Sequence, residues 1–189
     1  MKRLTLILLA LTAVAMVLVA QSLSARIDGG QLRLASSRMR FLTGEAMDRL
    51  RDGATVKYAF QLTARENKDG RILARTPQQF AISYDLWEEK FAVTKLGSAP
   101  RSISHLSASA AEAWCVDNTS VPVAALGSTP TIWLRLDYQV IDPTEAPAPA
   151  DNSTLTLSGL IDIFSRRTRE QLRGSEEVGP LRLENLKKR

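Results

Sequence analysis

Residues 55–65 read TVKYAFQLTAR, and this stretch decides the fold. Its apolar side chains occupy every second position, which is the period of a β-strand that buries one face. The members of this core-facing set are Val56, Tyr58, Phe60 and Leu62. Asp69-Gly70 follows shortly afterwards, and this pair between two alternating runs is a strong hairpin signal.

The return strand begins at Arg71, and the same alternation resumes after Pro77. Its expected core-facing set is Phe80, Ile82, Tyr84 and Leu86. Proline cannot donate to a strand ladder, so Pro77 indicates an edge, a bulge or a strand break. A further strand begins at Phe91, and three consecutive antiparallel strands form a meander.

The flanking sequence adds strands and short helices. We expect a strand around the Gly29-Gly30 turn within 26–36, a loop over 97–104 and a strand over 131–141. A helix is predicted over 40–53, with Thr43 as its N-cap. A second is predicted over 106–116, where Ser109 and Glu112 have capping-box spacing and Ser107 is a competing cap. The fold class is therefore α+β: a largely antiparallel β-sheet or sandwich-like core with two or three short helices.

The N-terminus predicts a location outside the cytoplasm, either periplasmic or secreted. Lys2 and Arg3 precede an uncharged stretch that reaches Ala25, which is the pattern of a secretory signal peptide. Cleavage is expected after Ser24 or Ala25. The alternative is an uncleaved anchor, because the apolar run is long enough to span a bilayer. We assign residues 1–25 to this leader or anchor and 26–142 to a β-rich extracytoplasmic domain.

The net positive charge beyond the leader is concentrated at the C-terminus. Residues 26–164 carry 15 basic and 16 acidic residues, a net charge of −1, whereas residues 165–189 carry eight basic and four acidic residues, a net charge of +4. Residues 143–153 form a Pro/Ala-rich linker or loop, and 154–189 are expected to form an amphipathic helix and a basic, loosely ordered tail. Four cations are candidates for contact with a membrane surface: Arg166, Arg167, Arg169 and Arg173. The alternative is a solvated tail. A charge confined to a tail does not fit nucleic-acid binding.

The sequence offers little catalytic chemistry. His105 is the one histidine, so no multi-histidine metal site is expected, and no cofactor motif is present. His105 could still join a serine and a carboxylate in space, although no G-x-S-x-G elbow supports a hydrolase. Cys115, the one cysteine, is expected to be a buried apolar side chain rather than a reactive thiol.

The candidate interaction residues are Tyr84, Trp87, Glu88 and Trp133. Trp87 and Trp133 are out of phase with the core-facing sets of their strands, so both could lie on one exposed aromatic patch, which is typical of an interface. The alternative is that a helix covers both tryptophans.

The order of these segments resembles an uncharacterised bacterial secreted family, domain of unknown function 4390. The resemblance spans most of Leu32 to Asp142 and rests on EAMDRLRDG, TVKYAFQLTARENKDGRILA, ISYDLWEEKFAV, LSASAAEAWC and TIWLRLDYQV. It implies an envelope protein and supplies no catalytic residues.

These observations favour a non-catalytic extracytoplasmic binding domain whose partner is a protein or another envelope component. A carrier or sensor of an apolar ligand is the first alternative. A hydrolase that uses His105 is the second.

Overall fold

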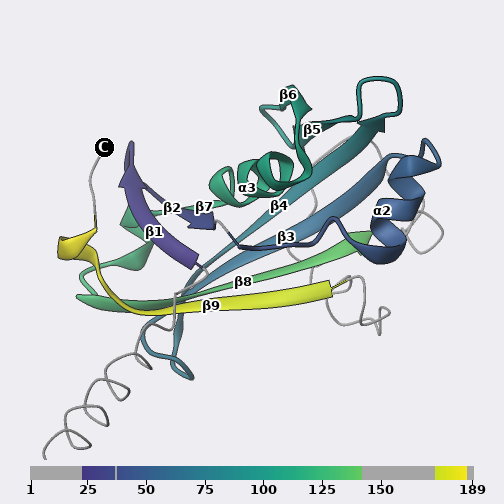
Figure 1. Ribbon diagram of the computed structural model, residues 1–189. Coiled ribbons are helices and arrows are strands. Elements are labelled where there is room, and N and C mark those ends of the chain that lie inside the picture. The colour runs from purple at the N-terminus through teal and green to yellow at the C-terminus, as the bar shows by residue number, and fades with distance from the viewer. Residues whose placement is uncertain (1–22, 37, 142–172, 187–189) are drawn as a thin grey trace, which may run out of the picture.

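The computed structural model describes residues 23–36, 38–141 and 173–186, and these contain two antiparallel sheets and two α-helices (Figure 1). The small sheet has the order β1-β2-β7, with β1 Leu23–Asp28, β2 Gln31–Ser36 and β7 Ser120–Pro122. The large sheet has the order β6-β5-β4-β3-β8-β9, with β6 Arg101–Leu106, β5 Lys90–Leu96, β4 Ile72–Asp85, β3 Val56–Arg65, β8 Thr131–Ile141 and β9 Arg173–Arg182. The helices are α2 Gly44–Arg51 and α3 Ala108–Asp117, with short 3-10 turns at Val123–Leu126 and Leu183–Asn185. The predicted α+β class with a sandwich-like core is confirmed.

Strand β3 lies at the centre of the large sheet, between β4 and β8. Its alternate side chains Tyr58, Phe60 and Leu62 are at most 1% exposed and face the small sheet and α3. The predicted meander of β3, β4 and β5 is confirmed by their antiparallel registers. Thr63 and Gln61, whose side chains point to the other face of the sheet, are also buried. The sequence alternation therefore assigns the faces of β3 correctly but underestimates its burial.

Proline 77 does not interrupt β4. The strand is continuous, and Pro77 pairs in register with Gln61 of β3. Strand β5 begins to pair with β4 only at Gln79, so Pro77 lies where β4 has one sheet neighbour. Of the three expectations, the edge position is the one that the structure supports. The expectation that Leu86 faces the core is wrong, because Leu86 lies in the β4–β5 turn.

The small sheet begins with a hairpin. Gly29 and Gly30, both with positive φ, connect β1 to β2, as two-residue turns of this kind require. The sheet packs beside α3 over one face of the large sheet (Figure 1). Helix α3 has Ser107 as its N-cap, whose hydroxyl accepts a hydrogen bond from the backbone N–H of Ala110. The competing cap is therefore the correct one.

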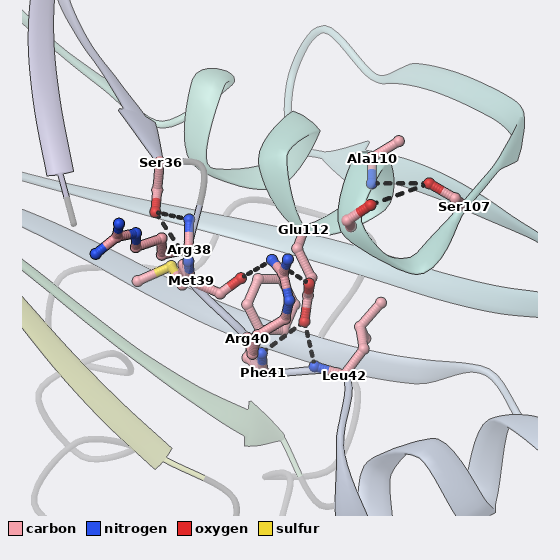
Figure 2. Close-up of polar contacts among 10 residues, drawn as sticks. Ser36, Arg38, Met39, Arg40, Phe41, Leu42, Ser107, Ala110 and Glu112 are labelled. Atoms are coloured by element: carbon pink, nitrogen blue, oxygen red, sulfur yellow. Dashed lines mark hydrogen bonds and ion pairs between the residues drawn. The ribbon is translucent and has the colours of Figure 1, made fainter.

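Glu112 of α3 is buried rather than part of a capping box. One carboxylate oxygen accepts hydrogen bonds from the backbone N–H groups of Phe41, at 2.7 Å, and Leu42, at 2.9 Å (Figure 2). The other oxygen lies 3.4 Å from a guanidinium nitrogen of Arg40. The side chain of Glu112 is 2% exposed, so these contacts replace the water that a carboxylate would otherwise bind.

Three strands form where the sequence predicted none, and the shortest of them is β7 of the small sheet. Residues 101–106 were expected within or beside a loop, and they form the edge strand β6. Residues 173–182 were expected in a loosely ordered tail, and they form β9. Strand β1 contains residues 23–25, the last three residues of the expected leader. The linker predicted over 143–153 and the helix predicted after it, up to residue 172, lie outside the described residues.

Cys115 is fully buried in the core, as the sequence predicted. Burial, with a smaller contribution from the nearby Glu112 charge, raises the pKa of its thiol far above the ordinary range. A thiol held in its neutral form is a poor nucleophile. Cys115 is therefore a packing residue.

Replacing Glu112 should destabilise the fold. In Glu112→Ala two buried N–H groups lose their acceptor, so the free energy of unfolding should fall by about 2–5 kcal/mol in urea denaturation. Glu112→Gln keeps one acceptor oxygen and should lose less than half of that. Glu66→Ala, at a side chain that is 48% exposed, is the control and should change stability by no more than about 0.5 kcal/mol. A Glu112→Ala protein as stable as this control would contradict the assignment.

Candidate binding site

The turn between β4 and β5 presents the most exposed apolar side chains of the described residues. Trp87 is 96% exposed and Leu86 is 57% exposed, and the two are adjacent in the chain. Ile72, at the other end of β4, is the third exposed large apolar residue. An indole fully in water is uncommon, because Trp is usually buried over most of its surface. We define the hairpin tip as residues 85–90.

Hydrogen bonds to Asp85 fix the backbone of the hairpin tip. One carboxylate oxygen of Asp85 accepts hydrogen bonds from the backbone N–H groups of Trp87, at 2.8 Å, and Glu88, at 3.0 Å. These two bonds stabilise the charged form and lower the pKa of Asp85. Glu89 completes the turn in the left-handed region, with φ 53°. Trp87 is therefore exposed on an ordered turn, which lowers the entropy cost of binding through it.

A shallow, open hollow of about 300 Å³ adjoins the hairpin tip. It lies between the tip and the end of β6, where His105 has a φ of 60°. The rings of Tyr84 and Phe91 pack 4.8 Å apart beside it. Its lining residues are Ser83, Tyr84, Asp85, Glu88, Lys90, Phe91, Ala92, Ser104 and His105. The structure thus brings Tyr84, Trp87 and Glu88, three of the four predicted interaction residues, to one hairpin.

The one histidine lies between a hydroxyl and a carboxylate in this hollow. His105 Nδ1 lies 2.9 Å from Ser104 Oγ, and Nε2 lies 3.0 Å from Glu88 Oε2. The three groups are those of a serine–histidine–acid triad, but the ring nitrogens are exchanged, because in a triad the serine contacts Nε2 and the acid contacts Nδ1. Sequence spacing alone could not have placed Glu88 there. The His105 and Glu88 side chains are 69% and 54% exposed, however. Triads work with a buried acid and little water, and water would compete for both of these contacts.

The hairpin tip is acidic. Its charged side chains are three carboxylates and one ammonium, those of Asp85, Glu88, Glu89 and Lys90. This charge surrounds the exposed pair Leu86-Trp87. An anionic lipid surface would repel such a tip, whereas a basic rim around an apolar pocket would attract it.

Trp133 does not belong to this surface. It pairs with Arg65 at the far end of β3, whereas the hairpin tip extends beyond the other end. Its ring lies against the backbone of Gly179, where an added Cβ would come within 2.5 Å of the indole. Lys68 Nζ lies 6.0 Å from the ring centroid. The expectation of one patch containing both tryptophans is therefore wrong, and no helix of the described residues covers Trp87.

Only one of the four predicted membrane-surface cations lies in the described residues. Arg173 is the first residue of β9 and is exposed. With Arg135, Asp137 and Tyr138 it borders a second open hollow, of about 440 Å³. Arg166, Arg167 and Arg169 lie outside the described residues. Within the described ranges, no helix has the length and apolarity needed to cross a bilayer, and no group of three potential metal ligands occurs.

No protein-family model matches the chain, and neither a curated protein nor a solved structure is significantly similar to it. The resemblance to domain of unknown function 4390 stays a prediction.

The order of the hairpin tip should depend on the ionised form of Asp85. Because the pKa of Asp85 is lowered, its contribution is present at neutral pH and is lost as the pH falls through that lowered value. Amide exchange followed by NMR should show protection of the Trp87 and Glu88 N–H groups above this transition. Asp85→Ala should remove that protection at every pH, while Asp69→Ala, in the β3–β4 turn, should leave it unchanged. Equal protection in Asp85→Ala would show that another group orders the tip.

Proposed function

We propose that this protein is a non-catalytic binding domain that works outside the cytoplasm and holds a protein partner through the hairpin tip. The observation that carries the proposal is the 96% exposure of Trp87 on a turn fixed by Asp85. Trp is enriched among residues that dominate binding energies, and a pre-ordered turn loses little entropy on binding. The leader-like sequence of residues 1–25 supports the location.

The chemistry of the tip defines the partner. Leu86 and Trp87 would enter an apolar pocket, and the carboxylates around them would face cations on its rim. Apolar anchors surrounded by charged groups are the usual composition of a protein interface, where the anchors give affinity and the rim gives orientation. The partner is therefore expected to be a protein with a basic surface.

Site-specific photocrosslinking in the native host tests this function. A photoreactive amino acid replaces Lys90, an exposed residue of the hairpin tip, in one protein and Ile72 in a control, because Ile72 is exposed at the opposite end of β4. A discrete crosslinked product should form from position 90 and not from position 72. Trp87→Ala should reduce crosslinking at position 90 roughly tenfold or more, as expected for a binding hot spot. Equal crosslinking from both positions would overturn the proposal.

The packing of the interior weighs against a carrier of apolar ligands. Phe60 has its ring centroid 5.2 Å from that of Phe80 and 5.8 Å from that of Tyr138. Phe41 adds contacts of 4.9 Å to Tyr58 and 5.3 Å to Phe60. These side chains occupy the space between the two sheets that an apolar ligand would need.

A hydrolase is the second candidate, because Ser104, His105 and Glu88 are in contact. Hydrolysis of a p-nitrophenyl ester by the purified protein tests it, with Ser104→Ala as the variant and Ser102→Ala as the control. We expect no hydrolysis above that of free imidazole at the same concentration, because the exposed pair is solvated. The hydrolase would be favoured by a rate of hydrolysis well above that of free imidazole, provided that Ser104→Ala abolishes this rate and Ser102→Ala leaves it unchanged.

A further inference from the structure

The first strand of the fold begins inside the segment expected to be removed. Leu23 is 1% exposed and belongs to the hydrophobic core. Its backbone pairs with Ser36 of β2, and the Ser24 hydroxyl donates a hydrogen bond to the Ala35 carbonyl at 3.4 Å. Ala25 is partly buried against the same core. Residues 23–25 are therefore part of the folded domain.

Cleavage after Ala25 would damage this sheet. It would remove Leu23, Ser24 and Ala25, which account for three of the six paired positions of β1. Burial of one leucine side chain typically contributes a few kcal/mol, so the loss of Leu23 is not neutral. Cleavage after Ser24 would remove Leu23 as well. A mature protein that keeps the observed sheet must begin at or before Leu23.

The sequence just before Leu23 offers a suitable site. Ala20-Gln21-Ser22 places small side chains at the first and third positions before the Ser22–Leu23 bond, which is the pattern that signal peptidases accept. Gln21 is also the first strongly polar residue after the apolar run. We propose that a signal peptidase hydrolyses the Ser22–Leu23 bond, leaving a carboxylate on Ser22 and an amine on Leu23. The proposal rests on the extracytoplasmic location included in the proposed function.

A second stretch with small residues is less suitable. Ala13-Val14-Ala15 has the same spacing but lies within the apolar run of residues 4–20. Cleavage there would leave the apolar sequence MVLVA at the start of the mature chain. A bond at the polar end of the run is the more accessible one, because the apolar run itself lies in the bilayer during export.

Intact mass and N-terminal sequencing of the protein from its native host test the proposal. The full chain is expressed with a C-terminal tag, and the cytosolic, envelope and secreted fractions are analysed. The expected mature chain begins at Leu23. A chain that begins at Met16, Ala25 or Arg26 would overturn the proposal, as would one that keeps Met1.

A matched pair of variants identifies the bond that is cut. Ser22→Leu places a bulky side chain directly before the proposed bond and should reduce the Leu23-starting chain roughly tenfold or more. Ser24→Leu makes the same change directly before a rival bond, at a side chain that is exposed in β1, and should leave processing unchanged. The opposite pattern would assign cleavage to the rival site.

These outcomes separate the site from the function. Cleavage at another bond in an exported chain would overturn the site alone, and crosslinking from the hairpin tip would still test the binding function. A chain that keeps Met1 and stays in the cytosolic fraction would overturn both the site and the extracytoplasmic location.

Discussion

A buried carboxylate connects helix α3 to the segment that leads into helix α2. Glu112 lies on α3, and the N–H groups that it binds belong to the segment that leads into α2. The same segment carries Phe41, whose ring contacts Tyr58, Phe60 and Tyr138 and whose carbonyl accepts a hydrogen bond from the Tyr58 hydroxyl at 2.9 Å. Burial raises the pKa of Tyr58, so this hydroxyl keeps its proton and remains a donor. One charged side chain thereby positions the aromatic centre of the core.

The C-terminal end of α3 is held by cations. Arg26 of β1 pairs with the Asp117 carboxylate, Arg33 of β2 donates to the Asp117 carbonyl at 3.3 Å, and Lys95 of β5 donates to the Asn118 carbonyl at 2.9 Å. These groups lie where the helix dipole is negative and where the last carbonyls lack helical partners. Burial and the neighbouring Arg33 charge lower the pKa of Lys95. Helix α3 is thus fixed to both sheets, and the hairpin tip extends from a rigid support.

The central strands could be predicted from sequence because their apolar side chains alternate. This holds for β3 and β8, and the bounds of β8 agree with the prediction residue for residue. Strand β9, RGSEEVGPLR, has no such alternation: it is an edge strand, and Val178 is its one buried side chain. Glu112 has the spacing of a capping box, and only the tertiary structure shows that its partners come from 70 residues earlier in the chain. The separation of Trp87 from Trp133 likewise depends on strand register, which no local pattern contains.

The position of β9 affects how the sheet assembles and how it opens. Its partner β8 ends at Ile141 and β9 begins at Arg173, so this pairing closes a longer loop than any of the hairpins in the meander. Contacts across long loops form late, because the entropy of loop closure must be offset first. When β9 separates, the edge of β8 loses its hydrogen-bond partners next to the buried Leu134 and Leu136. An unpaired edge of that kind can pair with a strand from another molecule, and β9 occupies this edge of β8 with a strand whose one buried side chain is Val178.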